Sequence, residues 1–215
     1  MRGAGKEADL IAAKKRDLAG IAYRLFCEKG IDNVSLQEIA DNSDYGIASL
    51  YRYFVNKQRL VVEAATLKWE EYLDEIRKRM TEADFERMTA AQVFGFYLDS
   101  FLLLYTDHRD LLKFNQFFNV YAQSEKIDQK TMEPYRIMIR SFKERFDAMY
   151  QKACLDHTIR TDESKEEMFS KTLHLMLAAI TRYAVGLVYI PDEFDPIGEL
   201  TMLKEMLLER YKESV

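Results

Sequence analysis

The sequence predicts an all-α protein, and three observations lead to that prediction. Only 8 Gly and 3 Pro occur among 215 residues, so helix breakers are scarce. Helix formers such as Leu, Ala, Met, Glu and Lys are plentiful, and apolar residues recur at helical spacing along most of the chain. Apolar residues make up 48% and charged residues 31%, which is typical of a globular chain with a buried core.

The first two helices are predicted from an apolar stripe and a capping pattern. Residues 14–29 carry apolar side chains at helical spacing, and Gly30 follows at the position where helices commonly stop. Ser35 and Glu38 have the spacing of a capping box, in which the hydroxyl accepts from the Glu38 amide and the carboxylate reaches back. They predict a short second helix that ends near Ser43.

A tight turn then leads to two more helices. Residues 44–46 form the turn, with Gly46 able to adopt a positive φ. The third helix is predicted over Ile47–Phe54, and Asn56 caps a fourth helix that runs from residue 57 to about residue 80. Two short helices joined by a three-residue turn are typical of the helix-turn-helix, whose second helix enters the DNA major groove.

The rest of the chain predicts longer helices. Their ranges are 89–106, 107–121, Pro134–Cys154, a helix from Thr161 or Asp162 to Tyr189, and Asp195–Tyr211. Pro134 suits the first turn of its helix, where a missing amide hydrogen is tolerated. The domain boundary is expected inside the fourth helix, near Trp69. Residues 12–68 would form the helix-turn-helix domain and residues 69–215 the larger helical domain, joined through a shared helix.

Composition and motifs exclude several classes of protein. The sequence contains no phosphate-binding glycine loop, no serine-hydrolase elbow and no HExxH zinc motif. No nucleophile clusters with a base, so we expect no enzyme, no catalytic residue and no cofactor. Cys154 and His157 lie three positions apart, but two ligands do not make a zinc site, so no metal is expected.

Targeting signals are also missing. The N-terminus has no hydrophobic signal region, and the longest apolar-rich part, residues 173–190, is interrupted by polar side chains. Cys27 and Cys154 are isolated in the sequence and are expected to be reduced thiols. We therefore expect a cytoplasmic protein with no membrane association.

Charge is distributed unevenly along the chain. The formal net charge is −5, but the first 60 residues hold ten cations against eight carboxylates, whereas the remainder is acidic. The N-terminal part is therefore the better candidate to meet a polyanion. Residues 14–16, Lys-Lys-Arg, could form a basic arm along a nucleic-acid backbone or a solvated helix start.

The turn and the third helix display side chains suited to DNA. Tyr51 and Tyr53 can donate phenolic hydrogen bonds to phosphates, and Lys57 lies at a helix start, where amides also face an anion. Arg52 and Gln37 are the candidates for base edges. Tyr51 could instead be a packing residue, and Lys57 a solvated lysine. The predicted DNA-binding residues are Ser35, Gln37, Gly46, Ile47, Ala48, Ser49, Tyr51, Arg52, Tyr53 and Lys57.

The segment IADNSDYGIASLYRYFVNKQRL, residues 39–60, resembles the signature of the TetR family of transcriptional regulators. The upstream segment AYRLFCEKGIDNVSLQEIA, residues 22–40, resembles the family pattern as well. The sequence departs from the pattern at residues 44–46, where Gly-Val-Ser is commonest, and at Ile47, which replaces a polar residue. Asp44 puts a negative charge near the DNA face, and Ile47, Ala48 and Ser49 offer mainly apolar contact, as to thymine methyls.

The resemblance implies a homodimer formed through the last helices, with a ligand pocket in each C-terminal domain. Apolar stripes over residues 173–187 and 200–211 are compatible with such an interface, although they could instead bury against their own chain. The predicted interface residues are Leu173, Leu177, Ile180, Ala184, Leu187, Leu203 and Leu207.

Aromatic and sulfur-containing side chains are the candidates for the pocket lining. They would suit an apolar or flat aromatic effector, but a dry core would have the same composition. The predicted lining residues are Phe94, Tyr97, Phe101, Tyr105, Phe114, Phe117, Phe118, Tyr121, Met149, Met176 and Tyr183.

These observations lead to one functional hypothesis and one alternative. We expect a repressor that binds a palindromic operator in double-stranded DNA as a homodimer and is released by a small hydrophobic effector. The alternative is a helical small-molecule-binding protein that has lost specific DNA recognition, as Asp44 and Ile47 suggest.

Overall fold

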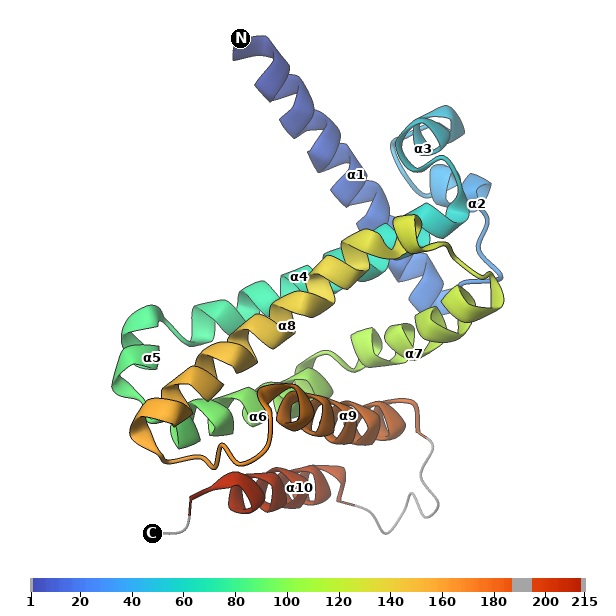
Figure 1. The fold of residues 1–215 in the computed structure, drawn as a ribbon. Coiled ribbons are helices and arrows are strands. Elements are labelled where there is room, and N and C mark those ends of the chain that lie inside the picture. The colour runs from blue at the N-terminus through green and yellow to red at the C-terminus, as the bar shows by residue number, and fades with distance from the viewer. Residues whose placement is uncertain (1, 187–194, 214–215) are drawn as a thin grey trace. The chain divides into compact units, whose positions relative to one another are not determined.

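The computed structural model describes residues 2–186 and 195–213, which form ten α-helices (Figure 1). An isolated antiparallel bridge joins Ile159 and Lys212, and the described residues contain no β-sheet. The predicted all-α fold is therefore confirmed. The helices are α1 (Arg2–Lys29), α2 (Leu36–Asp41), α3 (Ile47–Phe54), α4 (Lys57–Arg79), α5 (Glu82–Arg87), α6 (Ala90–Asp107), α7 (Arg109–Ser124), α8 (Gln129–Asp156), α9 (Lys165–Ala184) and α10 (Pro196–Tyr211).

The chain divides into two compact units that do not follow sequence order. Unit 1 comprises the residues up to Glu71 together with Phe114–Met138, and unit 2 comprises Tyr72–Lys113 together with the residues from Ile139 onward. The division inside α4 lies near the residue at which we expected the domain boundary. Residues 114–138 differ from the prediction, because they pack with the N-terminal helices and not with the larger C-terminal part.

Unit 1 is held by the apolar stripes of its helices and by a buried polar cluster formed by Trp69, Asn115 and Tyr135. Phe114 from α7 stacks on Phe26 and meets Tyr23 edge-on, with ring centroids 6.4 and 4.9 Å apart. The sequence pattern of α1 to α4 places the core side chains as expected. The buried apolar residues of these helices include Leu18, Ala22, Leu25, Phe26, Ile39, Ala40, Leu50, Phe54, Leu60, Val61, Ala64 and Ala65.

The predicted end of α1 is confirmed, and so is the Ser35 half of the capping box predicted for α2. Gly30 adopts a φ of +82°, and its amide donates to the Phe26 carbonyl at 2.9 Å, so it ends α1 as a glycine in the left-handed region. The Ser35 hydroxyl accepts from the Glu38 amide at 3.1 Å. The Glu38 carboxylate receives Lys29 Nζ at 2.5 Å. This hydrogen bond, with a smaller contribution from the Ser35 amide, lowers the pKa of Glu38.

Three helix starts differ from the prediction. Helix α8 begins at Gln129, so Pro134 lies inside the helix and not in its first turn. The Asp128 carboxylate caps the start, because it accepts from the Thr131 amide at 3.0 Å and from the Thr131 hydroxyl at 2.8 Å. Helix α1 also begins earlier than residue 14, and α7 begins two residues later than expected.

Capping boxes explain two further differences. Helix α5 was not expected, and it starts at a complete capping box formed by Thr81 and Asp84. Helix α9 is capped by Ser164 with Glu167, and not by Thr161 or Asp162. It ends at Ala184, whereas the predicted end at Tyr189 lies outside the described residues.

In unit 2, α6 packs with α9 and α10, and Figure 1 shows these three helices side by side. Aromatic rings fill the space between them and α8. Phe94 meets Phe146 and Tyr211 edge-on, with centroids 6.2 and 5.9 Å apart, and Tyr97 meets Phe101 and Phe146 at 5.3 and 5.5 Å. This aromatic core fixes the α6 face that borders the cavity described below.

Candidate DNA-binding face and ligand cavity

Helices α2 and α3 form a helix-turn-helix, and Figure 1 shows them as two short helices beside α1. The turn is held by the Ser43 hydroxyl, which donates to the Ala40 carbonyl at 3.0 Å and accepts from the Tyr45 amide at 3.2 Å. Gly46 caps α3 with a φ of −69°, so the expected positive φ is wrong. Any residue can adopt this extended conformation. Because glycine has no side chain, no side-chain hydrogen bond caps the start of α3.

None of the ten predicted DNA-binding residues is buried. Leu50 and Phe54 turn inward at 0% and 1% exposure, which leaves the opposite face of α3 toward solvent. The half-buried members are Ile47, Ser49, Tyr53 and Lys57. The exposed members are Ser35, Gln37, Gly46, Ala48, Tyr51 and Arg52.

Tyr51 is the most prominent side chain of this face, with 56% of its surface exposed. Arg52 Nη2 donates to the Tyr53 hydroxyl at 2.8 Å, and the guanidinium lies over the Tyr53 ring at 4.8 Å. These contacts order the arginine without burying it. The packing alternative for Tyr51 is not supported, because an exposed ring adds little to the core.

Lys57 is held more firmly than the sequence indicates. Its Nζ donates to the Asp32 carbonyl at 3.2 Å and lies 5.9 Å from the centroid of the Tyr121 ring. Partial burial lowers the pKa of Lys57, and the nearby Asp32 and Glu125 oppose that shift. Burial also raises the pKa of Tyr121 to about 12. The ammonium group has three donors, so two remain for an incoming anion.

The link between α3 and α4 is a strained γ-turn. Val55 adopts a φ of +67° and a ψ of −47°, and the Asn56 amide donates to the Phe54 carbonyl at 2.7 Å. This turn is rare for any residue and unfavourable for a β-branched one. It places Asn56, whose Oδ1 accepts from the Arg59 amide at 3.0 Å, at the cap of α4.

Two other features of the face bear on base recognition. Gln37 Nε2 donates to Asp41 Oδ1 at 2.8 Å, so the amide must exchange this partner to reach a base. Asp44 is exposed and Ile47 is half-buried. The first turn of α3 therefore offers small or apolar side chains for any direct contact with a base.

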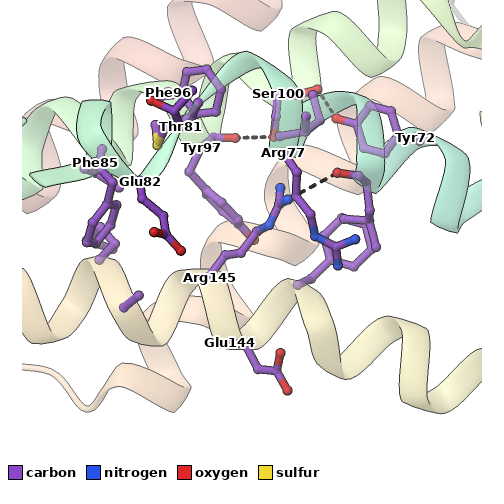
Figure 2. Close-up of a pocket in the computed structure, with 17 residues that line it drawn as sticks. Tyr72, Arg77, Thr81, Glu82, Phe85, Phe96, Tyr97, Ser100, Glu144 and Arg145 are labelled. Carbon is purple, nitrogen blue, oxygen red and sulfur yellow. Dashed lines mark hydrogen bonds between the residues drawn. The ribbon is translucent and has the colours of Figure 1, made fainter.

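Unit 2 contains a cavity of about 460 Å³, which is within the usual range for small-molecule sites (Figure 2). Helices α4, α5, α6 and α8 contribute its walls. Tyr72 donates from its hydroxyl to the Ser100 carbonyl at 2.5 Å, and Arg145 Nη2 donates to the Leu73 carbonyl at 3.2 Å. The apolar lining residues are Leu73, Ile76, Met80, Phe85, Val93, Phe96, Phe142, Ala148 and Met149.

Most of the predicted lining residues do not border this cavity. Only Tyr97 and Met149 do so. The prediction is wrong for the others at this cavity because most of them fill the cores of the two units, as the dry-core alternative expected. The buried ones are Phe94, Phe101, Tyr105, Phe114, Phe118, Tyr121 and Met176. Phe117 is 58% exposed, and the half-buried Tyr183 donates to Glu199 at 2.5 Å.

Sequence reasoning missed the cation in the cavity wall. Phe142, Arg145 and Met149 follow one another at three- and four-residue spacing, so they share a face of α8. A charged residue on an otherwise apolar helix face was the signal that could have found Arg145.

The predicted dimer residues also divide into two groups. Ile180, Ala184 and Leu207 are buried against their own chain, so the prediction is wrong for these three. Leu173, Leu177 and Leu203 are half-buried, and Leu187 lies outside the described residues. The apolar side chains that α9 and α10 expose are Leu175, Ile197, Met202 and Met206.

The described residues contain neither a candidate membrane span nor a candidate metal cluster. Between residues 2–186 and 195–213, no helix has the length and hydropathy needed to cross a membrane. In the same ranges, no three His, Cys, Asp or Glu side chains gather as a metal site would require. Cys27 and Cys154 are both exposed, and neither forms a disulfide within the described residues.

Comparison with known proteins supports the interpretation of the N-terminal unit. Residues 21–64 match the profile of the bacterial regulatory proteins of the tetR family. No curated protein matches the chain.

Solved structures share the fold over nearly the whole chain. The fatty acid degradation regulator FadR from Bacillus halodurans has a TM-score of 0.68 at 14% identity, covering 91% of this chain and 94% of its own. FadR from Bacillus subtilis, in complex with stearoyl-CoA, has a TM-score of 0.68 at 14% identity, covering 89% and 96%. A regulator from Saccharomonospora viridis in complex with choline has a TM-score of 0.71 at 15% identity, covering 94% and 100%.

At such low identity the structures establish the fold and leave the ligand open, as the different molecules in two of them illustrate. The fold agrees with the match of residues 21–64, which contain the helix-turn-helix. Residues 21–64 therefore carry the similarity to the tetR family of bacterial regulatory proteins, and the solved structures that share the fold of this chain include a TetR-family transcriptional regulator.

Proposed function

We propose that this chain binds a palindromic DNA operator in the cytoplasm as a homodimer, represses transcription there, and is released by a small apolar effector. The observation that carries the proposal is the exposed face of α3. This face presents Tyr51 and Arg52 to solvent from a helix whose other side is completely buried. A monomer gains nothing from such an exposed aromatic side chain, whereas a phosphate or a base edge would use it.

The DNA contacts divide by chemistry. Tyr51 and the two remaining donors of Lys57 suit phosphate oxygens, which fix the protein on the duplex. Arg52 can exchange its Tyr53 partner for a guanine edge, and Gln37 can exchange Asp41 for an adenine edge. Ile47, Ala48 and Ser49 would then supply apolar contact in the groove.

Dimerisation is proposed through the exposed sides of α9 and α10. Leu175, Met202 and Met206 are 49%, 55% and 60% exposed, and they lie on the two helices that follow one another at the end of the chain. Small residues such as Ala178 on α9 allow another helix to approach closely. A single recognition helix buries too little surface for tight specific binding, and a two-fold dimer reads two half-sites.

The effector is proposed to occupy the cavity between α4, α5, α6 and α8. Helix α4 connects this cavity along the chain with the helix-turn-helix, because it starts directly after α3. An effector acts as a switch only if it binds the released state better than the DNA-bound state. To raise the released fraction of the protein from about 1% to about 99%, the effector must bind the released state more favourably than the DNA-bound state by about 5.5 kcal/mol.

Selection of bound duplexes from a random pool tests the proposal. We expect enrichment of a palindrome whose half-sites lie about one helical turn apart, or a multiple of it. Fluorescence anisotropy on the selected duplex should then show that Lys57→Ala lowers the slope of log affinity against log salt by roughly one. Lys78→Ala is the matched control, since Lys78 is an exposed lysine at the far end of the same helix.

A second function is favoured by Asp44 and Ile47, which put an acid and an apolar side chain where DNA contacts are expected. In that case the chain is a small-molecule-binding protein without specific DNA recognition. Failure of the random pool to enrich any sequence, with the protein folded and dimeric, would support this second function and count against the first.

A further inference from the structure

The cavity in unit 2 has four charged side chains in its lining, and they are not equivalent. Arg77 is exposed and pairs with Asp74, so its charge is already balanced. Glu82 and Glu144 are exposed, and their charges are screened by water. Arg145 alone among these four is half-buried, rising from α8 between the apolar residues Phe142 and Met149.

The Arg145 guanidinium has unused hydrogen-bonding capacity. Its recorded bond is from Nη2 to the Leu73 carbonyl, while a guanidinium has five N–H donors. Among residues 2–186 and 195–213, no carboxylate is recorded within 4.0 Å of it. Burial lowers the pKa of Arg145 and the neighbouring Arg77 lowers it further, but an arginine remains charged at neutral pH.

The hydroxyl of Tyr97 is the second unusual group at this place. Tyr97 is 8% exposed, and its Oη is buried and has no hydrogen-bond partner within the described part of the chain. Figure 2 shows the ring descending from α6 toward the Arg145 side chain. Burial raises the pKa of Tyr97, and the charge of Arg145 opposes that shift, which also indicates that the two groups are close.

Two groups that can donate hydrogen bonds therefore lie in the lining of one apolar cavity, and the Tyr97 hydroxyl has no acceptor among the described residues. A buried hydroxyl without a partner is unfavourable by roughly 1–3 kcal/mol, so natural proteins rarely keep one without a reason. A carboxylate supplies four acceptor positions, and its planar shape matches the fork of a guanidinium.

We propose that the cavity binds an apolar molecule that carries a carboxylate, with Arg145 pairing with the carboxylate and the Tyr97 hydroxyl donating to one of its oxygens. The proposal rests on the proposed function, because this molecule would be the effector. The apolar body lies against Leu73, Val93 and Phe142.

Calorimetric titration of the purified full-length protein tests this assignment. The probes are octanoate, dodecanoate and hexadecanoate, the alcohols of equal chain length, and dodecyltrimethylammonium as a cation. We expect at least one acid to bind roughly ten-fold or more tightly than its alcohol, because only the acid forms charge-assisted hydrogen bonds.

The key variant is Arg145→Gln, which keeps a donor for the Leu73 carbonyl and removes the charge. We expect it to weaken binding of the acid roughly ten- to hundred-fold and to leave the alcohol unchanged. Arg145→Lys keeps the charge and should fall between the two, since it loses the fork. Lys143→Ala is the control on the same helix, because Lys143 pairs with Glu166 outside the cavity lining.

Tyr97→Phe separates the hydroxyl from the ring. We expect it to weaken binding of the acid by roughly three- to ten-fold, with no effect on the alcohol. Equal affinity for acids and alcohols, binding only of the cation, no binding of any acid, or indifference of the acid to Arg145→Gln would each overturn the carboxylate assignment.

The proposed function is tested separately with anisotropy on the selected duplex. If the acid binds as expected but does not release DNA, the carboxylate site stands and the role of its occupant as effector is wrong. If the alcohol binds as tightly as the acid and releases DNA, the proposed function stands and the carboxylate site is wrong.

Discussion

Each unit of the molecule buries polar side chains among aromatic rings, but the two sites differ in whether the polar atoms have partners. In unit 1, Asn115 Oδ1 accepts from Trp69 Nε1 at 3.1 Å and from the Tyr135 hydroxyl at 2.8 Å. In unit 2, the Tyr97 hydroxyl has no partner among the described residues, and Arg145 uses one of its donors on a backbone carbonyl.

The difference shows how a structural polar group can be distinguished from a binding group. The Asn115 cluster satisfies itself and joins three helices, so its function is met within the fold. The Tyr97 hydroxyl lacks an acceptor among the described residues and Arg145 has donors left over, which is why we propose that a molecule from outside completes the site. Four experiments can break or sharpen this comparison.

The largest effect is expected from Asn115→Ala, which removes the acceptor that two buried donors share. We expect the free energy of unfolding to fall by about 2–4 kcal/mol, because each donor left unpaired loses roughly 1–3 kcal/mol. Urea unfolding followed by circular dichroism measures the change. Asn119→Ala, at an exposed position one turn later, should change it by less than about 0.5 kcal/mol. A loss below about 1 kcal/mol at Asn115 would show that the cluster is not structural.

The next effect concerns Asp156, a satisfied carboxylate in unit 2. It accepts from the Ala90 amide at 2.6 Å and from the amide and hydroxyl of Thr158 at 3.0 and 2.9 Å. Partial burial would raise the pKa of Asp156, but the amides of Thr158 and Ala90 outweigh it, so the pKa is lowered. Asp156 is therefore a polar group of unit 2 whose partners lie within the fold itself.

Because the folded pKa of Asp156 is depressed, its contribution is complete above the usual Asp value of about 4 and is lost as pH falls through the folded value. We expect Asp156→Asn to lower the free energy of unfolding by about 1–2 kcal/mol at neutral pH. The difference from the unchanged protein should shrink toward the acid end of a pH series of urea titrations. A difference that is constant with pH would exclude the carboxylate charge as its cause.

Tyr51 can be compared with the buried tyrosines, because its hydroxyl lies at the surface of unit 1. Water satisfies it in the free protein, so Tyr51→Phe should leave the free energy of unfolding unchanged. On DNA the hydroxyl is proposed to meet a phosphate, so the same change should weaken binding by about 1 kcal/mol, roughly five-fold. Anisotropy measures the loss, which should be similar for specific and random duplexes. Loss confined to the specific duplex would indicate a base contact and not a phosphate contact.

The all-α fold and the exposed face of α3 were predictable because local signals determine them. The stripe before Gly30, the Ser35 cap and the turn before Ile47 each act within a few residues. The end of α1 and the ranges of α2 and α3 match the prediction closely, whereas α1 begins earlier than predicted. The starts of α8 and α9 were less predictable. Pro134 and Thr161 are plausible start signals, but in the structure Asp128 and Ser164 cap these helices.

The cavity was not predictable from residue type alone. Residue type does not distinguish an aromatic side chain that fills a core, as Phe94 and Phe118 do, from one that borders a cavity. Which of the two it does depends on the packing of α5 and α8 against α6, and sequence spacing does not encode that distance. Asn115 likewise could have faced a ligand or solvent, and only its two buried donors show that it is structural.

The smallest effect, and the sharpest test of the comparison, comes from making the same change in both units. Tyr135→Phe removes a hydroxyl that donates to Asn115, so we expect a loss of about 1 kcal/mol in the free energy of unfolding. Tyr97→Phe removes a buried hydroxyl that has no partner, so the free energy of unfolding should stay unchanged or rise by up to about 1 kcal/mol.

Both variants are measured by urea titration without any added acid, so that ligand binding does not contribute. Equal losses at the two positions would mean that the Tyr97 hydroxyl has an acceptor in solution, such as a bound water, and the contrast between the units would disappear. A stable Tyr97→Phe protein that has lost affinity for carboxylates would instead show a hydroxyl retained for its ligand at the expense of the free fold.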